Sequence, residues 1–143
     1  MSDSWGAQKA AALKARAEKE RIKQETELRE QDFINQRARS MWQELSSTLR
    51  KMATDLNRHY GEDYLNVTPL DSLDTLYIQS PKGNAELRFN SAIPEITISP
   101  ALDAGREARL KFSVESREVL FAWVGGVTAP VGRTAEWLLD KFV

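Results

Sequence analysis

The residue types that most often carry catalytic chemistry are scarce in this chain. His59 is the only histidine, and the sequence contains no cysteine. Without cysteine the chain has no disulfide, no thiolate nucleophile and no zinc site built on sulfur. A single histidine also excludes a histidine-rich metal site, although catalysis by carboxylates or lysine alone stays open. We therefore expect a non-catalytic protein in which His59 stabilises the end of a helix.

Four acidic residues near the middle of the chain are candidates for binding a hard cation. Asp71 and Asp74 follow shortly after Glu62 and Asp63. A calcium loop needs alternating oxygen ligands, a central glycine and a closing glutamate, and this spacing matches no such loop. Turn formation at Asp71 or Ser72 is the simpler interpretation. We expect neither a metal nor a cofactor.

The segment GGVTAPVGRT, near the C-terminus, is a candidate anion site. Glycine-rich loops can hold phosphate through backbone N–H groups at a helix N-terminus, which here would lie beside Arg133 and Thr134. The segment lacks the lysine and hydroxyl residue of the P-loop, and its glycine spacing differs from the dinucleotide-binding motif. Turn formation explains Gly125, Gly126 and Gly132 without a ligand.

Alternating apolar and polar residues predict an antiparallel sheet between Leu73 and Val124. Turn formers separate four or five strands, which we expect to pair as a meander. The expected strands lie within residues 74–80, 86–89, 92–99, 108–116 and 119–126. A short helix follows the sheet and should pack on it through one apolar face. The residues of that face are Ala135, Leu138, Leu139 and Phe142.

The polar face of this sheet is a candidate binding surface. In a meander, six side chains would share it: Tyr77, Gln79, Arg88, Asn90, Arg109 and Lys111. Aromatic and arginine side chains can stack on or grip a small ligand or a nucleic acid. Antiparallel sheets normally have one solvated face, which explains the same residues without a ligand.

A single long helix is predicted from about Gly6 to Tyr60. The segment has no proline, and Gly61 supplies the usual residue for a helix C-terminus. From Ala38 onward, apolar side chains recur at spacings of three and four and form one stripe. Its residues are Trp42, Leu45, Leu49, Met52 and Leu56. Either the chain's own sheet, which we favour, or the same helix of a second chain would cover this stripe.

The beginning of this helix is charged where a packed helix would be apolar. Opposite charges lie four residues apart at several places between Lys9 and Asp32, as in Arg21 and Glu25. Each such pair contributes only about 0.2–0.5 kcal/mol, but several together can hold an exposed helix. Sparse apolar side chains could complete a seam between copies of the chain. The candidate contacts are Leu13, Ile22, Leu28, Trp42 and Leu45.

Charge is distributed unevenly along the chain, although its net charge is only −1. Basic residues outnumber acidic ones between Arg37 and Arg58, and acidic residues dominate from Glu62 to Asp103. We expect the two regions to face each other within the fold or across an oligomer. A nucleic-acid-binding domain usually concentrates more positive charge than this, so we do not expect a nucleic-acid partner.

The expected fold class is α+β: a long N-terminal helix, an antiparallel sheet and a short C-terminal helix. Residues 1–36 would be an exposed, charged helical arm, and residues 37–143 a single α+β domain. The expected function is a non-catalytic interaction or scaffold module that forms a homo-oligomer, preferably a dimer, or binds a helical protein. The alternative is a small-ligand or nucleic-acid binding domain that uses the polar sheet face. Without an apolar run of bilayer-spanning length, we expect no membrane partner and a cytoplasmic location.

Overall fold

The structure is a computed structural model that describes residues 2–70, 73–102, 107–115, 118–123 and 127–143. Its elements in chain order are α1 (Ser2–Tyr60), β1 (Asn66–Pro69), β2 (Thr75–Ser80), β3 (Gly83–Asn90), β4 (Glu95–Leu102), β5 (Glu107–Glu115), β6 (Glu118–Ala122), β7 (Thr128–Ala129) and α2 (Val131–Asp140). The chain divides into two compact units, Met1–Phe33 (unit 1) and Ile34–Val143 (unit 2). This division falls within α1, three residues before the boundary that we expected after residue 36.

Unit 2 is built on one antiparallel sheet whose strands pair in chain order from β1 to β7. The α+β class and the antiparallel pairing are confirmed, but the expected count of four or five strands is wrong, because the described residues form seven. The additional strands are the short edge strands β1 and β7. Three of the four residues of β1 are exposed, so backbone pairing with β2 holds this strand and no alternating apolar pattern marks it. The turn residues proposed at Asp71, Ser72, Gly125 and Gly126 lie outside the described residues.

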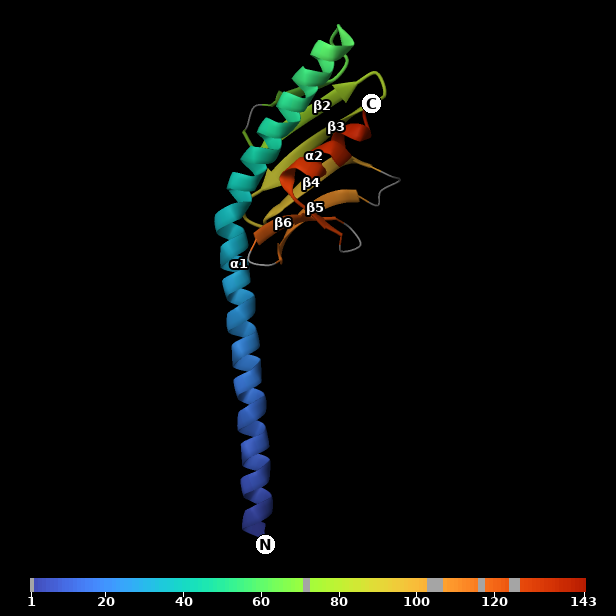
Figure 1. Cartoon of the computed structure of the whole chain (residues 1–143). Helices are drawn as coiled ribbons and strands as arrows, with labels where there is room; N and C mark the ends of the chain where they lie inside the picture. Colours follow the sequence, from blue (N-terminus) through green and yellow to red (C-terminus); the bar gives the residue numbers. More distant parts are fainter. Residues whose placement is uncertain (1, 71–72, 103–106, 116–117, 124–126) are drawn as a thin grey trace. The chain divides into compact units, whose positions relative to one another are not determined.

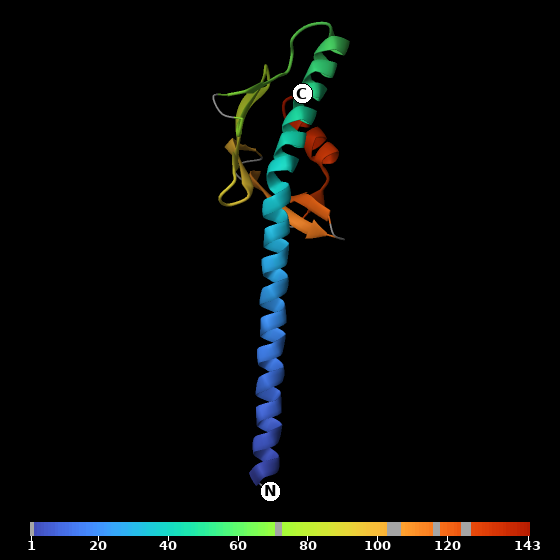
Figure 2. The same ribbon diagram turned by 90° about the vertical axis from the view of Figure 1, so that its left-hand side faces the viewer.

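The apolar core of unit 2 lies between the sheet and two helical segments. Figure 1 shows the second part of α1 and the short helix α2 on the same side of the sheet. Figure 2 shows the sheet curling, so that β2 and β3 lie on one side of this part of α1 and the orange-coloured strand region of β6 on the other. The alternate side chains of the central strands that face the helices are buried: Leu76, Ile78, Leu87, Phe89, Ile96, Ile98, Leu110 and Phe112.

The apolar stripe of α1 packs on this sheet, as we expected. Trp42 is only 1% exposed, and its ring stacks on Phe89 with 5.9 Å between ring centroids. Its Nε1–H donates a hydrogen bond of 3.0 Å to the carbonyl oxygen of Leu73. Leu45 and Leu49 are fully buried. Farther along the stripe, the side chains of Met52 and Leu56 are half-buried.

An ion pair just before β2 also connects this helix to the sheet. Arg39 of α1 lies 3.0 Å from a carboxylate oxygen of Asp74, and its guanidinium lies 5.6 Å from the centre of the Phe89 ring. The pair joins the basic region of the helix to the acidic region that follows it. A salt bridge between half-exposed groups contributes only about 0–1 kcal/mol to the free energy of unfolding. Its main effect is therefore to orient α1 on the sheet.

The end of α1 is fixed by Asn57 together with Gly61. Gly61 has a φ of 94°, a backbone conformation that favours glycine, and its N–H donates to the Asn57 carbonyl at 2.9 Å. The Asn57 side chain accepts hydrogen bonds from the N–H groups of Tyr64 and Leu65, both at 2.9 Å. Its Nδ2 donates to the Leu65 carbonyl at 2.8 Å. This amide therefore holds the chain reversal that leads into the sheet.

The C-terminal helix docks on the sheet as predicted. Ala135, Leu138, Leu139 and Phe142 are all buried. The Phe142 carbonyl accepts a hydrogen bond of 2.6 Å from the Ser80 hydroxyl of β2. These contacts tie the last residues to a strand that lies far away in sequence.

We predict that Leu49→Ala lowers the free energy of unfolding by about 2–5 kcal/mol, because it leaves a cavity in a close-packed core. Urea denaturation at fixed protein concentration measures the loss. The matched control is Leu73→Ala, since Leu73 is 84% exposed and its loss should stay within about 0.5 kcal/mol. Equal losses for the two variants would contradict the packing described for α1.

We predict that Asn57→Ala lowers the free energy of unfolding by about 1.5–4.5 kcal/mol, because three hydrogen bonds of about 0.5–1.5 kcal/mol each are lost together. Asn57→Asp keeps the oxygen that accepts from two N–H groups and loses only the donor, so it should cost less. Urea denaturation of both variants is the measurement. A larger loss for Asp than for Ala would show that the acceptor contacts are not what stabilises the turn.

Candidate functional site

The only histidine of the sequence contacts the preceding turn of its own helix. His59 Nδ1 lies 2.9 Å from the Asp55 carbonyl oxygen and 3.5 Å from a carboxylate oxygen of the same residue, one turn earlier in α1. Among the described residues, no three histidine, cysteine, aspartate or glutamate side chains lie close enough to hold a metal ion. Asp74, one of the acidic residues considered for a cation, pairs with Arg39 instead.

The proposed anion site beside α2 lacks an accessible hydroxyl group. Thr134 is fully buried, and its Oγ1 has no hydrogen-bond partner within the described part of the chain. Its N–H bonds to the Pro130 carbonyl at 3.0 Å and is therefore used within the helix. Arg133, the preceding residue, is exposed. The geometry at this helix start does not combine the two side chains around a ligand.

The polar sheet face carries all six residues singled out from the sequence, and the register brings four of them into two neighbouring rows, with Tyr77 and Gln79 farther along the sheet. The six are Tyr77, Gln79, Arg88, Asn90, Arg109 and Lys111. The register places Arg88 beside Thr97 and Thr97 beside Arg109, so the two arginines lie in one row across three strands. Asn90 and Lys111 flank Glu95 in the next row. Five of the six side chains are exposed, and Tyr77 is half-buried.

Two glutamates on this face offset the arginines, and sequence analysis did not include them. Arg88 pairs with Glu86 at 3.1 Å, and Arg109 lies 4.0 Å from Glu95. The alternation that selected the arginines also places both glutamates on the same face, so the signal was present in the sequence. An outer face with paired opposite charges is typical of a solvated surface, and it has less net attraction for an anion.

Unit 1 is a helix in which most of the described side chains are exposed. All side chains from Ala7 to Asp32 are exposed. Large apolar residues are among them: Trp5 is 66% exposed, Leu13 63%, Ile22 51% and Leu28 65%. With 3.6 residues per turn, Leu13 and Leu28 lie about 60° apart around the helix, whereas Ile22 lies about 180° from Leu13. Leu13 and Leu28 therefore share one side of the helix, and Ile22 does not belong to it.

The other two candidate contacts between copies lie in the core of unit 2. Trp42 and Leu45 are at most 1% exposed, and the sheet of the same chain covers them. A contact between copies through these two side chains would require the sheet to be displaced. The exposed candidates are therefore Leu13, Ile22 and Leu28.

Arg21 is the centre of the ion pairs in unit 1. Its guanidinium donates hydrogen bonds to Glu18, one turn before it, and to Glu25 at 2.8 Å, one turn after it. The hydrogen bond to Glu18 has the largest effect and raises the pKa of Arg21 above its ordinary value. Desolvation opposes this rise in part, and the hydrogen bond to Glu25 adds a smaller rise. The predicted pair of Arg21 with Glu25 is confirmed. Arg21 thus stays charged and is neutralised within its own helix.

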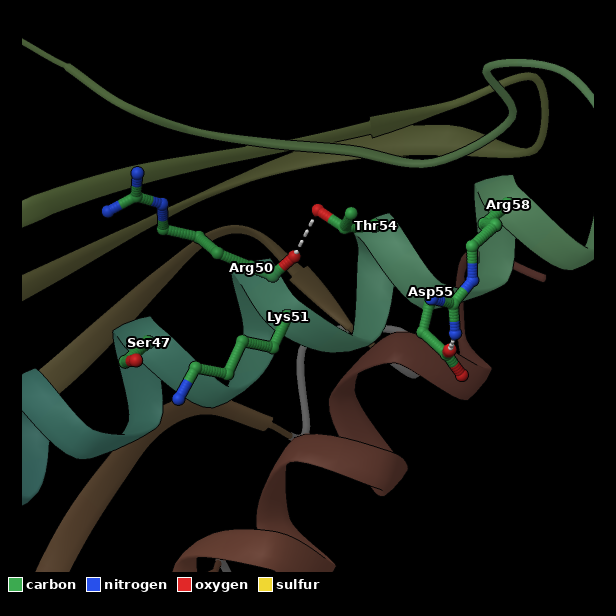
Figure 3. A pocket seen from close by; sticks show the side chains of 6 residues that line it. All are labelled: Ser47, Arg50, Lys51, Thr54, Asp55 and Arg58. Atoms are coloured by element: carbon green, nitrogen blue, oxygen red, sulfur yellow. Dashed lines mark hydrogen bonds and ion pairs between the residues drawn. The ribbon is translucent and has the colours of Figure 1, made fainter.

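The polar side of α1 carries a groove. The sequence indicated only an excess of basic residues in this part of the helix and did not predict the groove. We call it the basic groove; it has a volume of about 520 Å³ and is lined by Ser47, Arg50, Lys51, Thr54, Asp55 and Arg58. Figure 3 shows these side chains along the helix, with Arg58 turned to Asp55. An adjoining hollow of about 510 Å³ shares Ser47 and Lys51 and reaches Val131 and Gly132 at the start of α2.

The cations of the basic groove differ in their partners. Arg58 forms an ion pair of 2.6 Å with Asp55. The Thr54 hydroxyl donates to the Arg50 carbonyl at 3.0 Å, so it serves the helix backbone. Within the part of the chain that the structure describes, Arg50 and Lys51 form no ion pair. Among the described residues, no carboxylate offsets these two positive charges.

Comparison with known proteins assigns this chain to no family. No family model matches it, and neither a curated protein nor a solved structure is significantly similar to it. Within the described ranges, no helix has both the length and the apolar character needed to cross a bilayer. Three surfaces of the described residues are candidates for a function: the side chains of unit 1, the polar sheet face and the basic groove.

Proposed function

We propose that this protein is a non-catalytic interaction module that self-associates through the helix of unit 1. The observation that supports this proposal is the exposure of Leu13, Ile22 and Leu28 on a helix without a buried side chain between Ala7 and Asp32. Burial of Leu13 and Leu28, which share one side of this helix, against a partner removes apolar surface from water, which is the main driving force of association.

A second copy of the same helix is a suitable partner on grounds of charge. The sequence from Ser2 to Phe33 contains seven basic and seven acidic residues. Because the unit has no net charge, two copies approach each other without overall repulsion. A dimer is the simplest assembly that buries the same surface on both copies.

The expected association is weak and depends on protein concentration. Full burial of a leucine or isoleucine side chain stabilises by about 1.5–3 kcal/mol, and these side chains are already partly covered by their own helix. Association costs at least about 4 kcal/mol in lost freedom of motion. With so few apolar contacts on each copy, the gain exceeds this cost only slightly, which suits a reversible interaction module.

A second candidate function is the binding of a small anionic ligand, and two surfaces could serve it. On the polar sheet face, Arg88 and Arg109 already have glutamate neighbours. In the basic groove, Arg50 and Lys51 have no ion-pair partner among the described residues, and the adjoining hollow extends the space along α1. To bind an anion, the two arginines of the sheet face would have to give up their glutamate partners, whereas Arg50 and Lys51 would not lose an ion pair. We therefore favour the groove for this function.

Deletion of residues 1–30 should abolish self-association and leave unit 2 folded. None of the described side chains in the deleted segment belongs to the core, so the melting temperature of the remaining chain should change little. Sedimentation velocity over a range of concentrations, with the full chain as the reference, measures the association. A full-length chain that stays monomeric at every concentration would refute the proposed function.

Replacement of Arg50 and Lys51 by alanine should weaken the binding of inorganic tripolyphosphate at least tenfold, because charge-assisted hydrogen bonds contribute about 1.5–3 kcal/mol each. Titration calorimetry at low salt gives the Kd. The matched control is the Arg88→Ala, Arg109→Ala double variant on the polar sheet face, which removes the same number of charges. A greater loss in the control would place the site on the sheet, and no heat of binding for the unaltered chain would eliminate this second function.

A further inference from the structure

Charge is separated along the helix of unit 1, although the unit is neutral as a whole. Residues 9–17 contain three basic residues and no acidic one, and residues 24–32 contain four acidic residues and one basic one. The net charges of these two segments are therefore +3 and −3. All the side chains of both segments are exposed. The helix thus has a basic segment, residues 9–17, and an acidic segment, residues 24–32.

The basic and acidic segments do not neutralise each other within one helix. Their centres lie 15 residues apart, which corresponds to roughly 22 Å along a helix axis. The Debye length at physiological ionic strength is about 8 Å, so exposed charges at that separation are largely screened from each other. Apart from Glu25, which pairs with Arg21, the charges of each segment can therefore attract an opposite charge on another molecule.

The two possible orientations of a helix pair differ strongly in charge. A parallel pair in register places basic segment against basic segment and acidic against acidic. An antiparallel pair places each basic segment against the acidic segment of the other copy. From this difference we infer that two copies associate through unit 1 in antiparallel orientation, with residues 9–17 of one copy against residues 24–32 of the other. This inference rests on the proposed self-association and specifies its geometry.

One antiparallel register also brings the leucine side chains of the two copies into contact. When Leu13 of one copy is level with Leu28 of the other, Lys9 is level with Asp32, and Lys14 is level with Glu27. Leu13 and Leu28 share one side of the helix, so both can face the second copy. A parallel pair would also bring leucines together, and charge is therefore what selects the antiparallel orientation.

The middle of this antiparallel pair brings two copies of Arg21 close to each other. Two free guanidinium groups there would repel. Each Arg21, however, bonds to Glu18 and Glu25 of its own helix. Because both partners are already supplied, the centre of the pair carries no unpaired like charge from this residue.

Disulfide trapping can determine the orientation, because the chain has no cysteine of its own. The test uses three single variants of the full chain: Leu13→Cys, Leu28→Cys and, near the centre, Glu20→Cys. In the antiparallel pair, the two copies of residue 13 lie roughly 22 Å apart, too far for a disulfide. We expect no homodisulfide from Leu13→Cys or Leu28→Cys alone, a homodisulfide from Glu20→Cys, and a heterodisulfide when the first two are mixed.

Mixing Leu13→Cys with an isotope-labelled Leu28→Cys lets mass spectrometry identify the heterodisulfide. Leu13→Cys mixed with Ala11→Cys is the control for random collision, because Ala11 lies on another side of the helix and should give no disulfide. Homodisulfides of Leu13→Cys would overturn the antiparallel orientation. A dimer in sedimentation that gives no disulfide in any mixture would place the contact elsewhere and also overturn it.

Sedimentation of the unaltered chain separates failure of this inference from failure of the proposed function. If the chain is monomeric at all concentrations, self-association itself is refuted. If a dimer forms, its salt dependence adds a second readout. Added salt should weaken the antiparallel pair, because it screens attraction between the segments, whereas it would strengthen a parallel pair by screening repulsion. A dimer that tightens with salt would contradict the inferred orientation.

Discussion

The structure of unit 2 depends on the contact between Trp42 of α1 and the concave face of the sheet. A seven-stranded sheet with apolar residues on one side needs a cover, and this helix provides much of it. Trp42 makes two contacts with the sheet region: its ring stacks on Phe89, and its N–H donates a hydrogen bond to the carbonyl of Leu73, just before β2. Large aromatic side chains bury the most apolar area, and a buried indole N–H needs such an acceptor. Curling of the sheet around the helix allows the remaining apolar side chains to reach the same core.

Two different sources of stability operate in one continuous helix. In unit 2, α1 is stabilised by burial of side chains such as Leu45 and Leu49. In unit 1, helix-forming residues and ion pairs such as those of Arg21 replace burial. Most helices in proteins depend on packing, so a packed segment gives the unpacked one a nucleus from which to propagate. Once the packed segment has nucleated the helix, local sequence is therefore enough to continue it through the exposed segment.

Sequence patterns predicted the features that depend on burial, and they missed those that depend on the backbone. The spacing of Trp42, Leu45 and Leu49 predicted the buried stripe, because helical periodicity and burial select the same positions. The edge strands β1 and β7 were missed as strands because pairing of main-chain groups, not side-chain alternation, defines them. Asn57 was missed for a similar reason: its three hydrogen bonds go to backbone atoms after the helix. The polar sheet face was assembled correctly from alternation, but the charges of Glu86 and Glu95 were left out of its description.

The contact between Trp123 and Trp137 gives unit 2 an internal optical label. The two indole rings, one after β6 and one in α2, have centroids 3.9 Å apart. Chromophores in contact couple their electronic transitions, so this pair should produce a split circular dichroism band that neither indole gives alone. The band requires α2 to be seated on the sheet, and it disappears if side-chain packing is lost while helices and strands persist. Trp5 in unit 1 is 66% exposed, and a soluble quencher would reach it before the coupled pair. The tryptophans of this chain thus allow the two units to be followed separately without any added dye.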